Sequence, residues 1–281
     1  MRVRVLGTAA GGGLPQWNCG CPGYDLTRAV GGGRTQDGLA ITGDGSAHYL
    51  VNASADLRAQ LLAAPELAPP RHTRDPPVAG VLLTSGEVDH TLGLLTLREA
   101  ATVNVYATAA VWSALPFASI LDAYTTLRWH PVVSGRPFLL DGGVQVTAFA
   151  PGSKRPRYAR GADGDEWTVA YRFTDTRTGR ALVYAPGLAR WSDEFGAGIA
   201  GADVVLLDGT FATAAELGDA PTMGHVSIED SVVHLADHPG PQYVYTHLNN
   251  TNPHAWPDAL RDKDLARVGA RIAVDGEVFR L

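Results

Sequence analysis

Three apolar segments of this sequence are each followed closely by side chains that can bind a metal ion. The segments and the side chains that follow them are Val81–Leu83 with Asp89 and His90, Val204–Leu207 with Asp208, and Tyr243–Tyr245 with His247. Because the carboxyl ends of neighbouring strands can meet at one edge of a sheet, we expect these four side chains to converge. Two imidazoles and two carboxylates form a mixed nitrogen and oxygen site suited to iron, manganese or zinc, with room for water or oxygen. Asp89 taken alone could instead cap the helix that follows it.

The elements that must position these residues form an interleaved pattern of strands and helices. Short apolar runs separated by many Gly and Pro residues predict a sheet-rich domain, and several continuous runs predict strands that are covered on both faces. Helices are expected between the strands, one of them around Ile120–Leu127. We therefore expect an α/β fold of two sheets sandwiched by helices, with residues 1–281 as a single domain. The polar stretch Pro151–Glu166 is predicted to be an exposed loop over one end of this fold.

The composition narrows the class of protein. The 281 residues are 45% hydrophobic and 19% charged, which is typical of a globular domain. The formal charge of -6 argues against a nucleic-acid-binding protein, so a small-molecule substrate is expected. No apolar run is long enough for a membrane span and no secretory signal opens the chain, so we expect no membrane partner and a cytoplasmic location.

The order of these motifs resembles that of the metallo-β-lactamase superfamily. The motifs are a strand followed by D-H-x-x-G-L, a strand followed by Asp208-Gly209-Thr210, the triplet Met223-Gly224-His225, and a strand followed by Thr246-His247. This resemblance implies a four-layered αβ/βα sandwich. Further blocks are similar to the coenzyme PQQ synthesis protein B family, and they span nearly the whole chain. They are Gly7–Cys19, Arg34–Gln36, Asn52–Arg58, Gly93–Glu99, Tyr184–Gly187 and His247–Pro253.

One departure from the superfamily concerns the number of metal ions. Its dinuclear hydrolases carry H-x-H-x-D-H, whereas the same window here reads Ser85-Gly86-Glu87-Val88-Asp89-His90. Two zinc ions that lower the pKa of a shared water to about 7 are therefore not expected. The resemblance leaves Asp89, His90, Asp208 and His247 to hold one metal, Fe(II) or, as the alternative, zinc.

The family resemblance implies an iron-dependent, O2-using hydroxylase. Its expected substrate is the tyrosine-derived ring of a cross-linked Glu-Tyr intermediate in the biosynthesis of pyrroloquinoline quinone (PQQ) or a related compound. A single iron held by histidine and carboxylate keeps open positions for O2 and a phenol. Two alternatives stay open: a single-zinc hydrolase of the superfamily, and a non-catalytic carrier of PQQ or its precursor.

Further residues are candidates for binding or catalysis. His225 lies where superfamily members place a histidine near the metal, so it is the candidate acid or base, although it could instead cap the helix that begins near Ser227. Side chains that could hold substrate carboxylates are those of Arg34, Arg58, Arg98, Asn249, Asn250 and Asn252. Surface ion pairs for the arginines and turn formation for the asparagines are the alternatives.

Cys19 and Cys21 resemble the start of the family's C-x-C-x-x-C, which implies a structural zinc site near the cleft. The third position here is Tyr24, so only two thiolates remain, whereas a structural zinc ion normally has four protein ligands. Two free thiols in a loop are the alternative interpretation of this pair.

Overall fold

Two mixed sheets form the centre of the protein in the computed structural model, which describes residues 1–152, 154–217, 223–257 and 262–281. In spatial order, the strands of the first sheet are β14 (Val278–Arg280), β1 (Arg2–Gly7), β2 (Gly38–Thr42), β3 (His48–Val51), β4 (Val78–Leu82), β5 (Thr102–Ala107) and β6 (Thr126–Pro131). Those of the second sheet are β13 (Ala270–Ile272), β12 (Gln242–Thr246), β11 (Val204–Asp208), β10 (Ala181–Ala185), β9 (Thr168–Asp175), β8 (Val144–Gly152) and β7 (Phe138–Leu140).

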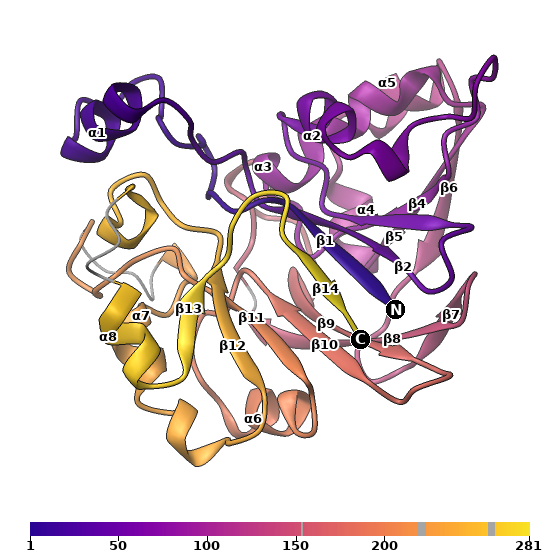
Figure 1. Ribbon diagram of the computed structural model, residues 1–281. Helices are drawn as coiled ribbons and strands as arrows, with labels where there is room; N and C mark the ends of the chain where they lie inside the picture. Colours follow the sequence, from indigo (N-terminus) through magenta and orange to yellow (C-terminus); the bar gives the residue numbers. More distant parts are fainter. Residues whose placement is uncertain (153, 218–222, 258–261) are drawn as a thin grey trace.

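Helices cover the outer face of each sheet, which gives the four layers (Figure 1). On the first sheet and its edges they are α2 (Leu57–Ala63), α3 (Val88–Thr91), η2 (Leu92–Glu99), α4 (Ala109–Ala114) and α5 (Ala118–Asp122). On the second sheet they are α6 (Asp193–Ile199), α7 (Ile228–Val232) and α8 (Asp262–Arg267), while α1 (Pro22–Val30) projects from the body. Single turns of 3₁₀ helix are η1 (Pro65–Leu67), η3 (Arg157–Ala159), η5 (Leu235–Asp237) and η6 (Pro253–Ala255). The predicted sandwich is confirmed.

The apolar strand sequences account for the layers. Every residue of β2, β3, β10 and β11 is buried, because one side of each strand faces the opposite sheet and the other faces helices. Val5, Ile41, Tyr171 and Val244 meet in the core between the sheets, and each is fully buried. Each such side chain contributes about 1.5–3 kcal/mol by leaving water.

Each sheet has one parallel half, and these halves position the site. β3 to β6 run parallel in the first sheet, and β10 to β13 run parallel in the second. The carboxyl ends of β4, β11 and β12 are followed by the residues with metal-binding side chains. Ser85, beyond the end of β4, forms a bridge with Thr168 at the start of β9, which holds the ends of the two sheets together.

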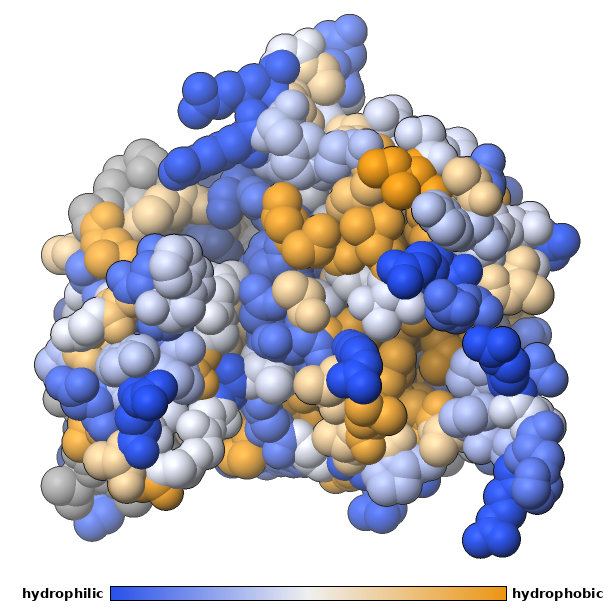
Figure 2. All heavy atoms as spheres, turned by 90° about the horizontal axis from the view of Figure 1, so that it is seen from above, coloured by the Kyte–Doolittle hydropathy of each residue, from blue (hydrophilic) through white to orange (hydrophobic). Residues whose placement is uncertain are grey.

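The chain ends meet where β1 pairs with β14. The amino group of Met1 donates to the carbonyl oxygen of Leu281 at 2.7 Å and also contacts the buried carboxylate of Asp175. Seen from above, the molecule is largely hydrophilic, with apolar side chains gathered in separate patches (Figure 2). Among the described residues, none of the helices has the length and apolar character needed to traverse a bilayer.

Candidate metal centre

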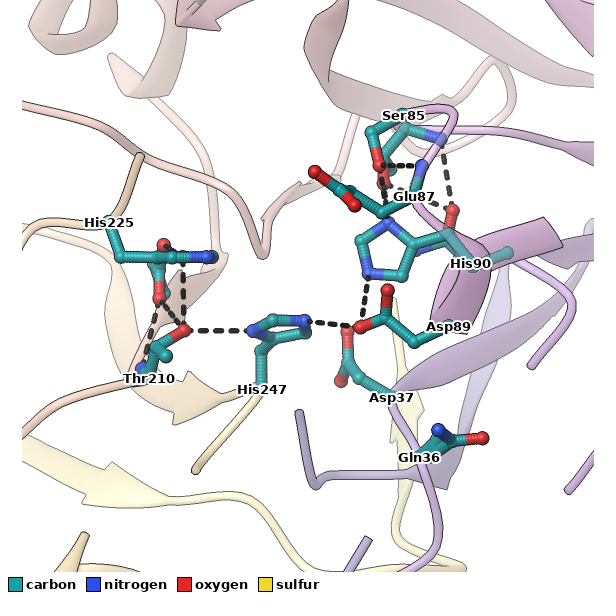
Figure 3. Close-up of polar contacts among 12 residues, drawn as sticks. Gln36, Asp37, Ser85, Glu87, Asp89, His90, Thr210, His225 and His247 are labelled. Atoms are coloured by element: carbon teal, nitrogen blue, oxygen red, sulfur yellow. Dashed lines mark hydrogen bonds and ion pairs between the residues drawn. The ribbon is translucent and has the colours of Figure 1, made fainter. Parts of the chain in front are cut away.

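Three ligand atoms converge at the end of the sandwich where β4 and β12 terminate. α3 carries Asp89 and His90, and His247 follows β12 directly. Asp89 Oδ2 lies 3.4 Å from His247 Nε2 and 4.0 Å from His90 Nε2, and the two imidazole rings are 5.3 Å apart. Figure 3 shows the three side chains pointing toward one another from the two sheets. They form a group whose ligand atoms all lie within 4.8 Å of one another, as expected around one ion.

The chemistry of this group fits a metal ion. His90 and His247 are each only 4% exposed, and the Nε2 atom of each ring is buried without a hydrogen-bond partner among the described residues. Leaving a buried polar atom unpaired costs about 1–3 kcal/mol. Two buried nitrogens without a hydrogen bond lie beside one carboxylate, and an ion among them would use the lone pairs of both.

The second nitrogen of each ring is held so that Nε2 keeps its lone pair. Ser85 Oγ lies 2.8 Å from His90 Nδ1, and Thr210 Oγ1 lies 2.8 Å from His247 Nδ1. The Thr210 hydroxyl donates its own proton to Asp208 Oδ1 at 2.6 Å, so its oxygen accepts from the Nδ1–H of His247. Such outer hydrogen bonds fix the tautomer and orientation of metal-binding histidines.

A second group contains Asp208, His225 and His247. Asp208 Oδ2 accepts a hydrogen bond from His225 Nδ1 at 2.6 Å, and its Oδ1 accepts from the hydroxyl and the amide of Thr210. Both carboxylate oxygens of this fully buried residue are therefore engaged within the protein. The structure thus brings three of the four predicted ligands together and places Asp208 against His225 and Thr210.

His225 stacks beside His247 and borders the cleft. The two rings are 5.3 Å apart and inclined by 20°. The alternative that His225 caps the next helix is wrong, because the Oγ of Ser227 accepts from the Asp230 amide and caps α7. Because Asp208 accepts from the Nδ1–H of His225, Nε2 is the ring nitrogen that remains for other contacts.

The residues that replace the superfamily's first two histidines have other partners. Ser85 holds the ring of His90, and the carboxylate of Glu87 lies 3.5 Å from the ammonium group of Lys154. Neither belongs to a ligand group among the described residues. Among the described residues, the possible metal positions are therefore the group around Asp89 and the group around Asp208, which share His247.

Burial sets the charges of the ligands. Burial is the largest influence on His90 and lowers its pKa to about 4, so the ring is neutral at pH 7. Burial alone would raise the pKa of Asp89, but the neighbouring His90 and His247 outweigh it and hold this pKa well below its usual range. At working pH Asp89 is therefore an anionic carboxylate and His90 a neutral imidazole, the forms that bind metals. Burial alone would lower the pKa of His247, but the neighbouring carboxylates, that of Asp89 first, outweigh it and raise this pKa, so metal binding would displace a proton from this ring.

A buried hydrogen-bond network beneath the ligands contains Asp37, which no motif in the sequence indicates. The hydroxyls of Tyr184 and Thr246 both donate to the Asp37 carboxylate. The Asn52 amide donates to the Tyr184 hydroxyl at 3.4 Å, and the Asn52 Oδ1 accepts from the amide and hydroxyl of Thr84. Burial raises the pKa of Asp37 to about 6.

This network reaches both histidine ligands. Thr84 Oγ1 lies 3.2 Å from His90 Nδ1, and Thr246 directly precedes His247. His247 and Asn52 have left-handed backbones, with φ of 58° and 64°, directly after the ends of β12 and β3. A left-handed histidine is costly and persists where the surrounding contacts enforce it, as at functional sites.

The metal ligands open into a cleft of about 780 Å³. Its lining includes His225, Asn249, Phe211 and a basic segment around residues 154–160. The predicted loop over 151–166 thus forms one side of the cleft, with β8 extending to Gly152. A volume of this size accommodates a small organic molecule.

The predicted arginine anchors lie away from this cleft. Arg34 donates to the carbonyls of Ala255 and Ala273 and to the Thr8 hydroxyl, so it holds loops together. Arg58 is exposed on α2, and Arg98 lies 3.4 Å from Glu99 on the surface. None of Arg34, Arg58 and Arg98 lines the cleft as placed here, so the structure does not support the prediction that these three guanidinium groups hold substrate.

The asparagines after His247 divide by role. Asn249 lines the cleft and donates to the Thr251 hydroxyl at 2.6 Å. Asn252 is buried, donates to the Gly209 carbonyl and caps η6, so turn formation explains it. Asn250 is also buried, and its amide faces Cys21 Sγ at 3.6 Å. Only Asn249 of the three is placed to touch a molecule in the cleft.

Cys19 and Cys21 are both free thiols. Cys21 contacts Asn250, and the Tyr24 ring at the third position lies under the Arg28 guanidinium at 5.5 Å. In the described part of the chain, neither cysteine belongs to a group of three possible metal ligands. The predicted structural zinc site therefore lacks a complete ligand set here.

Comparisons with known proteins agree with this architecture. Residues 48–248 match the family model described as a beta-lactamase superfamily domain. Among curated proteins, the chain is 39% identical to coenzyme PQQ synthesis protein B of Cupriavidus necator, over 98% of this chain and 97% of that protein. It is 38% identical to the protein of the same name from Bradyrhizobium diazoefficiens, over 98% of both chains.

Solved structures show the same fold. The Zn²⁺-bound PqqB from Methylobacterium extorquens superimposes with a TM-score of 0.93 at 34% identity and covers 100% of both chains. A diphosphatase from the PhnP family gives a TM-score of 0.72 at 18% identity, covering 100% of this chain and 97% of that one. The latter likeness shows the fold alone.

Proposed function

Because the chain belongs to the coenzyme PQQ synthesis protein B family of the metallo-β-lactamase superfamily, we propose that it acts in PQQ biosynthesis as an iron-dependent hydroxylase. The proposed substrates are O2, a two-electron donor that reduces the second oxygen atom to water, and a tyrosine-derived phenol, the cross-linked Glu-Tyr intermediate or a close relative. The family membership rests on relatives at 38–39% identity over nearly the full chain. The assignment to PQQ biosynthesis follows from the names of these relatives.

The observation that carries the oxygenase proposal is the composition of the converging group. Two histidine Nε2 atoms and one aspartate oxygen meet beside a cleft. Two histidines and one carboxylate on one face of an ion, with the remaining positions open, are the ligand set of non-haem Fe(II) oxygenases. When bound there, Fe(II) would supply the one-electron and O2 chemistry that protein side chains lack.

The chain's own residues would then position the substrate and move protons. Asp208 orients His225 through the 2.6 Å bond to Nδ1, which leaves Nε2 facing the cleft to accept or return the phenolic proton. Asn249 offers a hydrogen bond from the same side. The surrounding buried residues limit water around the ligands, which strengthens each of these polar interactions.

An oxygen electrode tests the proposal. Metal-free protein is loaded anaerobically with Fe(II) or with Zn²⁺ and is then given the cross-linked Glu-Tyr diamino acid in air-saturated buffer, with ascorbate as the two-electron reductant and a blank without the diamino acid. We expect substrate-dependent O2 consumption and a hydroxylated product with Fe(II), and neither with Zn²⁺, because zinc has no redox chemistry. Protein that binds iron stoichiometrically but consumes no O2 with this substrate would contradict the proposal.

A single-zinc hydrolase is the second candidate, because the solved relative from Methylobacterium extorquens is Zn²⁺-bound. The hydrolase hypothesis predicts that the Zn²⁺ form turns over esters or phosphodiesters without oxygen, because the ion would polarise the substrate. A carrier of PQQ or its precursor would instead bind tightly without turnover. The same preparations distinguish these outcomes.

A further inference from the structure

Four positive side chains line the cleft next to the metal centre. We call Lys154, Arg155, Arg157 and Arg160 the basic wall. The chain as a whole has a formal charge of -6, so this local excess of cations runs against the overall balance. The carboxylates that line the same cleft are those of Glu87 and Asp89. Charges of one sign inside a cleft focus the field and attract ligands of the opposite sign.

The backbone of the basic wall is held in place. The Tyr158 hydroxyl donates to the carbonyl of Gly86, in the turn that leads to the metal ligands. Ala159 is buried in a small cluster with Ala110 and Trp167. The Thr168 hydroxyl also donates to the Lys154 carbonyl at 3.3 Å. The wall therefore has a defined position relative to Asp89 and His90.

The four cationic side chains differ in whether they already have a partner within the protein. The Lys154 ammonium lies 3.5 Å from Glu87, and the Arg155 guanidinium lies 5.1 Å from the centre of the Trp167 ring. In the part of the chain that the structure describes, no carboxylate pairs with Arg157 or Arg160, and both side chains are exposed. Two guanidinium groups at the mouth of the cleft are thus available to a ligand.

We propose that Arg157 and Arg160 bind the carboxylates of a small polycarboxylate whose other end reaches the metal centre. The planar guanidinium pairs with a carboxylate through two parallel hydrogen bonds, which fixes the ligand's orientation as well as its charge. The cleft of about 780 Å³ suits a single small molecule, not a nucleic-acid strand. This inference rests on the proposed function for the reacting end of the ligand and deepens it by naming what holds the opposite end.

The binding test uses PQQ itself, a tricarboxylate, as the probe. Its dissociation constant is measured by fluorescence titration for the wild type and for Arg157→Gln, Arg160→Gln and the double variant. We expect about a tenfold weaker affinity for each single variant and about a hundredfold for the double variant, because each loses a charged hydrogen bond. Rising salt should weaken binding to the wild type more than binding to the double variant.

Matched controls use arginines outside the cleft. The Arg58→Gln, Arg98→Gln double variant removes the same amount of charge from exposed sites, so its affinity for PQQ should equal that of the wild type. The trimethyl ester of PQQ should bind the wild type and the cleft variants alike. Equal affinity of the wild type and the Arg157, Arg160 double variant for PQQ would overturn the proposal, as would an equal loss in the control variant.

Two further outcomes are decisive. If phosphotyrosine displaces PQQ as effectively as a matched dicarboxylate does, the wall recognises phosphate and the carboxylate assignment is wrong. If the variants lose PQQ affinity while the Fe(II) protein consumes no O2, the proposed oxygenase reaction fails and the carboxylate site stands. Thermal melting of each variant is recorded alongside, and exposed arginines are expected to leave it unchanged.

Discussion

Replacing His247 with asparagine is expected to abolish tight metal binding, because His247 belongs to both ligand groups. Asparagine tolerates the left-handed backbone found at this position, but its shorter amide does not extend to the position of Nε2. Loss of a direct ligand should exceed the roughly 10–100-fold weakening that follows loss of an outer hydrogen-bond partner. The measurement is a Zn²⁺ and Co²⁺ titration of metal-free protein, followed by metal analysis of the purified complex.

His225→Asn is the matched control for this substitution. His225 bonds to Asp208 and belongs to the neighbouring group, not to the group that contains Asp89. We expect this variant to keep one tightly bound ion and to lose most of its turnover. Unchanged metal affinity in His247→Asn, or loss of the ion in His225→Asn alone, would show that the ion binds elsewhere.

Removing the Tyr184 hydroxyl is expected to weaken metal binding from a distance. Tyr184 is fully buried, and its hydroxyl contacts both Asp37 and Asn52. Asp37 in turn contacts Thr246, which precedes His247, and Asn52 contacts Thr84, which lies beside His90. Tyr184→Phe leaves the Asp37 carboxylate with one donor fewer and the Asn52 amide without its acceptor. We expect a Zn²⁺ affinity about 10–100-fold lower, and a shifted visible spectrum for the Co²⁺ form.

The control for this network is Tyr243→Phe. Tyr243 lies on β12 and is also buried, but its hydroxyl donates to the carbonyl of His238, away from the ligands. Its removal should cost stability without changing the Co²⁺ spectrum. If Tyr184→Phe behaves in the same way, with native metal affinity and spectrum, the network only joins the sheets and does not position the ligands.

The strands that position the site could be predicted because each is marked by the residue types within a short stretch of sequence. Apolar runs marked β4, β11 and β12 to within a few residues, and a ligand residue after each run indicated a common edge. The family resemblance supplied the four-layered arrangement, which the structure confirms. Buried parallel strands give strong signals, because both of their faces require apolar residues.

Other elements depend on contacts that a local pattern does not contain. The helix expected around Ile120–Leu127 ends at Asp122, and β6 begins at Thr126. β6 is an edge strand whose residues are mostly exposed, so it lacks the alternation that marks a half-buried strand. α1 packs through Gly23 against Trp256, more than two hundred residues later, where a Cβ would collide with the indole.

The hydrogen-bond and ion-pair partners of polar side chains also could not be predicted from the sequence. Asp208 was expected beside Asp89, but its two oxygens are taken by Thr210 and His225. Asp37 directly precedes the apolar strand β2. The sequence there does not distinguish a buried, hydrogen-bonded aspartate from an exposed aspartate in a loop. Arg157 and Arg160 became candidates only when the fold placed their loop beside the cleft. Pairings of this kind arise from tertiary structure.

The most direct test is anomalous diffraction at the iron edge from crystals loaded anaerobically with Fe(II). We expect one anomalous peak per chain, within bonding distance of Asp89 Oδ2, His90 Nε2 and His247 Nε2. A peak among Asp208, His225 and His247 instead, a pair of peaks, or no ordered iron despite tight binding in solution would contradict a single ion held by these three side chains.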